Sequence, residues 1–501
     1  MSKIFNATIT TASMFLTFNA TSAASNQEKP NILWIEIEDT SPWMSIYGDN
    51  TVKTPNIEKF AKKGVVFTQM HVTAPVCSAC RSALMVGAMQ TTFGVHQHRS
   101  SYKGTEIYLP QNVKTLPEIF KENGYKTGCF GKKDYNFAYK MEDLYDYSES
   151  KMWSPKRNMT KIFANEQPWF IQLQLKGGKY WNAQKVLGKN SVDPRRITVP
   201  PQYPDIPEIR KDIAQHYAAI KMLDKELGEI IEQLKDSGTY DNTVIFFFSD
   251  HGCFLPRSKQ FVYDEGTRVP MMVLTPAKLN LTKAGTFNKN LASSIDISAS
   301  SLHAAGIDIP NYFEGKSIFA KNYQNEFVVS ARDRCDFTIE NMRALNDGKY
   351  LYIRNFMPEK PYMQPQYRDT RPTFKKIHKL AAQGHMTDVQ LKFFKLQPKP
   401  VEELYVISED KNQINNVAND SKYKDVMKLM RKRLADWQRS TDDKGQYPES
   451  LRSLTPIYQL WMARRHFKIK WSKEYAPFIN KTPEAQKLLN DKSIDYRVRI
   501  H

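Results

Sequence analysis

The chain has 501 residues, which at roughly 100–200 residues per domain allows two to four domains. Hydrophobic residues make up 41% and charged residues 25%, and this balance excludes a chain that is disordered throughout. Five cysteines in a chain of this length exclude a disulfide scaffold. The sequence contains no run of 18 or more apolar residues, so it predicts no transmembrane helix. Size and composition therefore indicate a globular enzyme.

Residues 1–24 have the layout of a secretory signal peptide. Lys3 precedes a moderately apolar stretch that ends in the small residues Ser22-Ala23-Ala24, so cleavage is expected after Ala24. The alternative is a disordered tail, because Thr and Asn dilute the apolar stretch. We therefore predict export to the periplasm or the medium.

The excess of 72 Lys and Arg over 53 Asp and Glu gives a net charge of +19, which favours polyanionic partners. Export argues against nucleic acid and leaves acidic polysaccharides or an anionic membrane surface. Two local basic clusters occur, at 371–399 and 464–473, but such clusters are most often solvated helix faces. Charge alone does not select the substrate.

Strand-like and helix-like segments alternate from residue 30 onward. The first is the apolar run ILWIEIED at 32–39, which predicts a buried strand ending in two carboxylates. Further strands are expected at 62–72, 126–130, 169–175 and 242–249, and helices at 82–89 and 209–234. Continuous apolar strands that alternate with helices predict an α/β fold with a parallel sheet covered on both faces.

The pattern changes after about residue 345. Strands are expected at 349–355 and 403–407, and a basic helix at 426–437, with a Pro-rich aromatic loop between them. We therefore predict a large N-terminal domain over 25–345 and a smaller α+β domain with a short antiparallel sheet over 346–501.

Two of the expected strands end in polar residues suited to metal binding. Glu38-Asp39 follows the first strand, and Asp250-His251 follows the strand at 242–249. Adjacent carboxylates repel each other and favour a cation, and ligand sites lie at the carboxyl ends of parallel strands. The alternatives are a helix N-cap at Asp39 and a turn at Asp250. Two such pairs on neighbouring strands favour a hard divalent ion such as calcium or magnesium.

The segment PVCSACRSALM at 75–85 has two interpretations. Cys77 and Cys80 form a C-x-x-C pair at a helix start, where thiol pKa values fall, which would suit redox chemistry. Cys77 and Arg81 are instead four residues apart, so one helix face would carry a nucleophile and a guanidinium. A helix N-terminus is a place where anions bind, so the second interpretation indicates chemistry on an anionic substrate.

With these residues in view, the sequence resembles the type I, formylglycine-dependent sulfatases of the alkaline phosphatase superfamily. The likeness is carried, in the family's order between residues 30 and 275, by PNILWIEIEDTSPW, TPNIEKFAKKGVVFTQMHVTAPVCSACRSALMVG, GYKTGCFGKKDYNF, MLDKELGEIIEQLKDSGTYDNTVIFFFSDHG and KQFVYDEGTRVPMMV. The stretch C-S-A-C-R matches the family signature C-x-(P/A)-x-R. The resemblance implies the alkaline-phosphatase-like fold, with a large sheet between helices and a smaller C-terminal domain.

The resemblance also implies the chemistry. A formylglycine-generating maturation enzyme would oxidise Cys77 to formylglycine (3-oxoalanine), whose hydrate would attack sulfur with one hydroxyl and expel sulfate with the second. A calcium ion would be held by Glu38, Asp39, Asp250 and His251 together with residue 77. Arg81, Lys132 and Lys259 would hold the hydrate and the sulfuryl oxygens, where cations stabilise the spreading charge.

This sequence departs from the family pattern at several places. Ala79 stands where Pro is commoner, which leaves the maturation route open. Asp134 and the Gly178-Lys179 pair stand where many relatives have a histidine, so the acid that protonates the leaving alcohol is not assigned by likeness. We predict His98 as this acid, although histidines in a loop are otherwise usually polar surface. Predicted substrate contacts are His96, Arg99, Lys179 and Arg334; charged residues near a domain junction, such as Arg334 and Asp336, are also often structural bridges.

The function predicted from the sequence is hydrolysis of sulfate esters on a sulfated polysaccharide or its oligosaccharides. The Glu38-Asp39 variant and the His-Gln-His-Arg stretch look most like bacterial enzymes that act on algal galactans or glycosaminoglycans, and a carrageenan-type galactan is the specific prediction. Hydrolysis of phosphate or phosphonate esters on the same fold is the first alternative. The others are a noncatalytic polyanion-binding protein and a redox protein that uses Cys77 and Cys80.

Overall fold

The computed structural model describes residues 29–101, 105–154, 157–165, 167–449, 453–454 and 457. The predicted signal peptide at 1–24 and the basic cluster at 464–473 lie outside these residues. Among the described helices, none combines the length and the apolar character that crossing a membrane requires.

An eight-stranded sheet forms the centre of the larger part of the molecule, in the order β4-β3-β5-β1-β6-β7-β2-β8. The strands are β1 (Asn31–Ile37), β2 (Val65–His71), β3 (Lys126–Phe130), β4 (Tyr147–Glu149), β5 (Trp169–Leu175), β6 (Thr243–Ser249), β7 (Met271–Leu274) and β8 (Thr286–Ser293). The strand β7 runs antiparallel to both neighbours, and the other pairs are parallel. The sheet is therefore mixed and mostly parallel.

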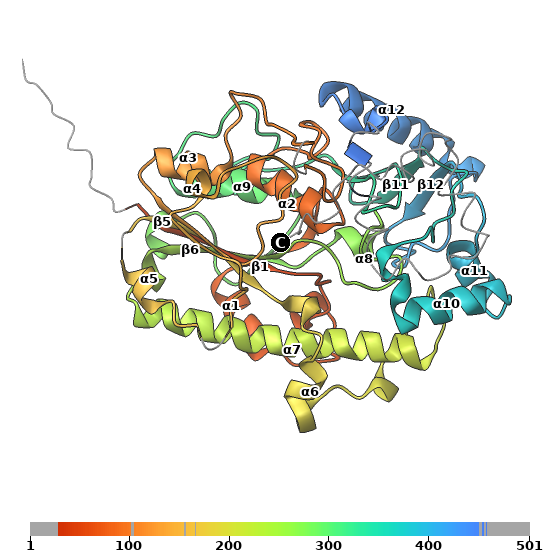
Figure 1. Cartoon of the computed structure of the whole chain (residues 1–501), viewed down its shortest axis with the longest axis horizontal. Coiled ribbons are helices and arrows are strands. Elements are labelled where there is room, and N and C mark those ends of the chain that lie inside the picture. Colours follow the sequence, from red (N-terminus) through yellow and green to blue (C-terminus); the bar gives the residue numbers. More distant parts are fainter. Residues whose placement is uncertain are drawn as a thin grey trace, which may run out of the picture.

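Helices cover both faces of this sheet, as Figure 1 shows. Below it in that view lie α1 (Pro55–Lys63) and the long α7 (Pro207–Asp236), and above it lie α2 (Cys77–Val86), α3 (Leu116–Glu122), α4 (Met141–Leu144) and α9 (Ser294–Ala304). Successive residues of β1 enter different cores: Leu33 and Ile35 join the core with α7, whereas Ile32 and Trp34 join the core with α2. A strand buried on both faces has the continuous apolar sequence seen here.

A second, antiparallel sheet of four strands has the order β12-β11-β10-β9. Its strands are β9 (Val328–Arg332), β10 (Met342–Asn346), β11 (Tyr350–Asn355) and β12 (Glu402–Val406). Around it lie α10 (Pro372–Ala382), α11 (Asp388–Phe394) and α12 (Lys424–Ser440), and the smaller helices α5 (Thr160–Ala164), α6 (Ala183–Leu187) and α8 (Asp264–Thr267) belong to the larger part of the chain. The boundary predicted near residue 345 falls inside β10.

The sequence-based elements agree with the structure most closely where strands are long and apolar. The predicted strands at 126–130 and 169–175 have the observed bounds of β3 and β5. The strand predicted at 62–72 begins too early, because α1 continues to Lys63. The helix predicted at 82–89 begins instead at Cys77, which places the cysteine in the first turn of α2.

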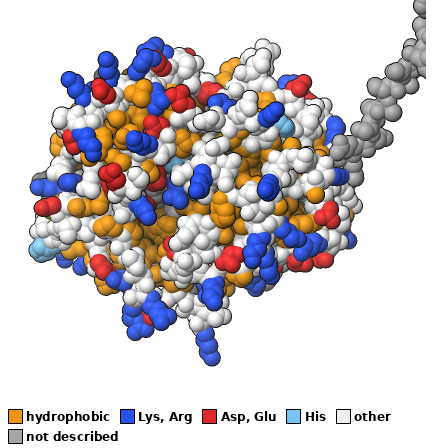
Figure 2. Space-filling view, turned by 180° about the vertical axis from the view of Figure 1, so that it is seen from behind, with side chains coloured by type: hydrophobic (Ala, Val, Ile, Leu, Met, Phe, Trp, Pro, Cys, Tyr) orange, Lys and Arg blue, Asp and Glu red, His pale blue; other side chains and the backbone are white. Residues whose placement is uncertain are grey.

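Positive side chains do not gather in one patch on the face shown in Figure 2. Lys and Arg side chains are spread over this face and alternate with Asp, Glu and hydrophobic surface. The net charge of +19 therefore acts as a general field on this side of the molecule.

Candidate active site

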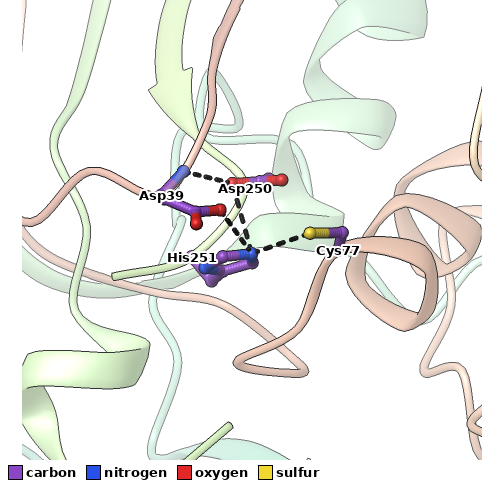
Figure 3. A group of neighbouring side chains, drawn as sticks. All are labelled: Asp39, Cys77, Asp250 and His251. Carbon is purple, nitrogen blue, oxygen red and sulfur yellow. Dashed lines mark hydrogen bonds and ion pairs between the residues drawn. The ribbon is translucent and has the colours of Figure 1, made fainter. Parts of the chain in front are cut away.

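Four side chains from three distant segments meet beside the carboxyl ends of β1 and β6. Asp39 follows β1, Asp250 and His251 follow β6, and Cys77 begins α2 (Figure 3). One ligand atom from each of these residues lies within 4.8 Å of the others, and all are buried. The structure thus brings together the two strand ends and the cysteine that the sequence singled out.

The close approach of the loops at this edge depends on a glycine. A Cβ atom on Gly178 would lie 2.1 Å from the carbonyl oxygen of Asp39, so a larger residue would force the loop after β5 away from β1. The amide of Gly178 donates to the carbonyl of Glu38 at 2.8 Å. This contact positions Lys179, the next residue, beside the cluster.

Cys77 is surrounded by positive and hydrogen-bonding groups. Its Sγ lies 3.2 Å from His251 Nε2, 3.4 Å from Lys259 Nζ and 3.7 Å from Lys179 Nζ. Burial alone raises the pKa of the thiol, but the charges of Lys132, Lys259 and His251 outweigh it, and the pKa of Cys77 lies well below its usual value. The position favours an anion.

Cys80 does not share this environment. Burial raises the pKa of its thiol, and the structure describes all five cysteines as free. The two thiols of the C-x-x-C segment thus have opposite pKa shifts, and the cations of the site act on Cys77.

Arg81 lies one helical turn after Cys77 and pairs with carboxylates from two strands. Its Nη1 donates to Glu36 at 2.5 Å, and its Nη2 donates to Glu38 at 2.6 Å and to Asp250 at 3.0 Å. Because every partner is buried, the acidic side chains hold Arg81 in place. Its guanidinium therefore fixes the arrangement of the carboxylates beneath Cys77.

Three lysines complete the positive environment. Lys259 Nζ lies 2.9 Å from Asp39 Oδ1, and Lys132 Nζ lies 2.6 Å from Asp134 and 3.8 Å from Glu38. Lys179 pairs with Glu38, and burial together with the nearby charge of Lys259 lowers the pKa of Lys179 to about 7. The side chains of Lys132 and Lys179 are 24% exposed, so they face the opening of the site.

The contacts of His251 indicate where a cation would bind. Its Nδ1 lies 2.9 Å from the carbonyl oxygen of Gly252, which fixes the proton on Nδ1. Nε2 then faces Asp39 Oδ1 at 3.3 Å, Asp250 Oδ1 at 3.6 Å and Cys77 Sγ at 3.2 Å. Ligand atoms 3.2–3.6 Å apart have the spacing of neighbouring ligands around an ion that binds oxygen at about 2.4 Å. The donor set therefore fits calcium, with Glu38 turned toward Arg81 and Lys179.

His98 connects the cluster to the second part of the chain. A ring nitrogen of His98 lies within 4.8 Å of Cys77 Sγ and an Asp134 oxygen, while its Nδ1 lies 3.4 Å from Cys335 Sγ and 3.5 Å from Asp336 Oδ2. Burial lowers the pKa of His98, but the charges of Cys335 and Asp336 raise it further, to well above its usual value. The groups around the ring therefore favour the protonated form of His98.

The other residues predicted to contact the substrate do not all lie beside Cys77. Arg99 Nη1 pairs with Asp336 at 3.2 Å, on the Cys77 side. The ring of His96 is buried elsewhere, where Asp333, Arg343 and Asp443 act on it and burial lowers its pKa. Arg334 is buried, and its guanidinium donates to both oxygens of Glu449 and to the carbonyls of His98 and Asp336. Its role as a substrate contact stays a prediction.

Three residues at the site were not predicted from the sequence. Glu36 pairs with Arg81, and a carboxylate inside an apolar strand was a signal for it. Gln174 donates to Glu38 at 2.7 Å from the end of β5. Tyr367 contributes a phenol from the loop before α10, where burial raises its pKa and the charge of Lys259 lowers it. No local pattern marks Tyr367.

Comparison with known proteins agrees with this geometry. The family model described as "Sulfatase" matches residues 30–307, more than half of the chain. The chain belongs to the sulfatase family. Its enzymatic class is accordingly sulfuric ester hydrolase, and its fold is the sulfatase fold of the alkaline phosphatase superfamily, as the sequence predicted.

Relatives extend this likeness beyond the family model. An "Ulvan-active sulfatase" of Formosa agariphila is 30% identical over 462 residues, covering 84% of this chain and 77% of the relative. The human "N-sulphoglucosamine sulphohydrolase" is 22% identical over 465 residues, covering 82% and 90%. Among solved structures, a "2-O GAG sulfatase" has a TM-score of 0.61 at 20% identity, covering 84% of this chain and 94% of that one.

Proposed function

We propose that this sulfatase releases sulfate from a sulfated polysaccharide or its oligosaccharides, with residue 77 as the nucleophile. The observation that carries the proposal is the position of Cys77 Sγ in the first turn of α2. It lies there within 3.2–3.7 Å of His251, Lys259 and Lys179 and within 4.8 Å of His98. Cys77 Sγ stands in for the oxygens of formylglycine, the residue that a maturation enzyme would make from it. The hydrate of formylglycine supplies one hydroxyl that attacks sulfur and another that releases sulfate.

Asp39, Asp250, His251 and residue 77 would hold a calcium ion, whose charge polarises the sulfuryl oxygens. Glu38 would contribute indirectly, because its carboxylate pairs with Arg81 and Lys179. Calcium binding should also raise the stability of the folded protein. Calcium at 100 times its Kd adds about 2.7 kcal/mol to the free energy of unfolding. We expect Asp250→Asn to lose this calcium-dependent rise in Tm, whereas Asp443→Asn, at a buried ion pair away from the site, keeps it.

The chain's own residues bind the anion and move the proton. Lys132, Lys179 and Lys259 attract the sulfate ester and stabilise the charge that develops on its oxygens. His98, whose protonated form its neighbours favour, donates its proton to the oxygen of the leaving alcohol, while Asp336 lies on the Nδ1 side of the ring. The bond between sulfur and the leaving oxygen is thus broken by two groups: the attacking hydroxyl bonds to sulfur, and the proton from His98 goes to the leaving oxygen.

A polymeric substrate is supported by charge and by likeness. The net charge of +19 attracts polyanions, and a relative with 30% identity is named for activity on ulvan. We propose that the protein is exported, as the segment 1–24 predicts, because a large polysaccharide is met outside the cytoplasm. A carrageenan-type galactan, the specific prediction from sequence, belongs in the same test as ulvan.

Sulfate release is the direct test. Protein coexpressed with a formylglycine-generating enzyme is incubated with ulvan, carrageenans, glycosaminoglycans and 4-nitrophenyl sulfate, beside a Cys77→Ser variant. Mass spectrometry of the peptide that contains residue 77 reports its conversion. Sulfate release by the converted protein and not by the variant supports the proposal.

The alternatives give different outcomes. Converted protein that hydrolyses 4-nitrophenyl phosphate or a phosphonate monoester faster than every sulfate ester would show an enzyme for phosphorus esters on the same fold. Converted protein that binds the polysaccharides and hydrolyses no ester would contradict catalysis and leave a polyanion-binding protein.

A further inference from the structure

An arginine and two aromatic side chains pack together beside the active site. The guanidinium of Arg371 lies 4.2 Å from the ring centroid of Trp181 and 4.7 Å from that of Phe254. The two rings meet edge to face, with centroids 4.9 Å apart. Phe254 is buried, Trp181 is 48% exposed and Arg371 is partly buried, so this group, the Arg371–Trp181 platform, presents its indole to solvent.

Each member of the platform comes from a segment that also builds the active site. Trp181 is two residues after Lys179, whose Nζ lies 3.7 Å from Cys77 Sγ. Phe254 is three residues after His251. The platform is therefore placed by the same loops, after β5 and β6, that place the groups around the nucleophile.

Arg371 is positioned from the second part of the chain. The turn before it contains Arg368, whose guanidinium donates to the carbonyls of Phe254 and Lys259 at 2.8 Å each. The amide of Arg371 donates to the carbonyl of Arg368 at 2.9 Å. This clamp ties the platform to Lys259, the lysine that contacts Cys77.

The guanidinium of Arg371 has no hydrogen bond or ion pair with any residue that the structure describes. Burial lowers its pKa, and the carboxylates that oppose this effect are those of Asp212 and Asp39. Asp212, the stronger of these, accepts a hydrogen bond from Thr373 at 2.5 Å. A partly buried guanidinium without a carboxylate partner is costly, and a bound anion would remove that cost.

We propose that the Arg371–Trp181 platform is a second anion subsite, which binds an anionic group on the sugar next to the one that carries the scissile sulfate. This inference rests on the proposed function. The shared ligand chemistry is a group with paired oxygens, a sulfate ester or a uronate carboxylate, which matches the two parallel donors of a guanidinium. Stacking on aromatic rings fixes the orientation of that guanidinium, and the exposed indole offers an apolar face for the sugar ring.

Kinetics on substrates with one and two anionic groups test the subsite. We compare Arg371→Gln with Lys375→Gln, which removes the same charge from the exposed side of α10 four residues away. For the oligosaccharide that the wild type desulfates best, kcat/KM is divided by its value for 4-nitrophenyl sulfate. We expect this ratio to fall about 10- to 100-fold in Arg371→Gln, mainly through KM, and to change less than two-fold in Lys375→Gln.

Two further variants separate binding from folding. Trp181→Phe keeps an aromatic surface and should retain most of the ratio, whereas Trp181→Ala should lose it at an unchanged Tm. A ratio that stays constant in Arg371→Gln, or that falls equally in Lys375→Gln, would overturn the subsite. Disaccharides that carry one sulfate plus either a second sulfate or a uronate identify the group: the one whose hydrolysis depends more on Arg371 is the ligand.

A binding measurement keeps the subsite testable if the proposed function fails. Where no ester is hydrolysed, an ι-carrageenan hexasaccharide is titrated calorimetrically into wild type, Arg371→Gln and Lys375→Gln. A Kd at least ten-fold weaker in Arg371→Gln alone supports the subsite independently of catalysis. Equal affinity in all three proteins overturns it.

Discussion

The charges around Cys77 and the charges around Arg343 are both buried, but they are arranged differently. Arg343 donates to Asp443 at 2.8 and 2.9 Å, to Asp333 at 3.1 Å and to the carbonyl of Met342 at 3.0 Å. Its guanidinium is thereby satisfied on every edge within its own cluster. Around Cys77, by contrast, several cations and carboxylates share partners, and His251 Nε2 faces two carboxylates and a thiol sulfur at once.

This difference separates a structural cluster from a functional one. Burial of charge is common to both, so burial alone does not identify a site. We call the Arg343 cluster closed because each nitrogen of its guanidinium is paired within the cluster, although Asp333 Oδ2 has no partner there. The Cys77 cluster is open in the sense that the proposed function adds a cation and an anion to it. Loop residues 94–99 contribute to both: His96 faces the Arg343 cluster and His98 faces Cys77.

The largest effect should come from opening the closed cluster. Arg343→Met leaves Asp333 and Asp443 buried without a cation, and we expect the free energy of unfolding to fall by about 3–5 kcal/mol in urea denaturation. Adding Asp443→Asn should recover part of this loss. Sulfate release per folded molecule should stay at the wild-type value; a specific loss of turnover would show that the two clusters are coupled.

Removing a cation from the open cluster should instead affect catalysis. Lys259→Met deletes the ammonium 3.4 Å from Cys77 Sγ, and we expect kcat/KM for 4-nitrophenyl sulfate to fall about 10²- to 10³-fold. Lys399→Met is the matched control, because Lys399 pairs with Glu340 in the second part of the chain. It should lower Tm and leave kcat/KM unchanged. Similar catalytic losses in both variants would remove the distinction.

The two histidines of the shared loop provide a finer comparison. We expect His98→Gln to lower kcat about 10²-fold for an alkyl or sugar sulfate, whose leaving alcohol needs a proton. The effect on 4-nitrophenyl sulfate should be much smaller, because 4-nitrophenolate leaves without one. His96→Gln should show no such dependence on the leaving group. Equal losses for both substrates in His98→Gln would contradict its role as the acid.

The same contrast explains what the sequence could predict. The bounds of β5 agreed with prediction because this strand, buried along its whole length, is largely apolar; those of β3 agreed although its sequence, KTGCF, is short and only partly apolar. The carboxyl ends of two strands located Asp39 and Asp250, since topology brings such ends together. The range 82–89 began five residues after the observed start of α2, because the turn from Cys77 to Cys80 has small residues without a clear apolar period, although both interpretations of the cysteine segment placed a helix start at Cys77.

Side-chain partners far apart in the sequence were beyond prediction. The partner of Arg334, Glu449, lies 115 residues further along the chain. His96 and His98 are two residues apart and face different clusters. Such pairings depend on tertiary packing and leave no local pattern.

The smallest effect, taken per pH unit, concerns a buried carboxylate that belongs to neither cluster. Glu226 of α7 lies near Lys176, Lys225, Glu229 and Tyr180, and burial raises its pKa from 4.5 to about 8, with Lys176 opposing the shift. Between pH 4.5 and 8 the folded state therefore keeps on Glu226 a proton that the unfolded state has already released. The free energy of unfolding should fall with rising pH in this interval, by up to about 1.4 kcal/mol per pH unit from this group. Glu226→Gln should remove that slope in urea denaturation at several pH values, whereas an unchanged slope would show that Glu226 is ionised and compensated, like the carboxylates that pair with Arg81.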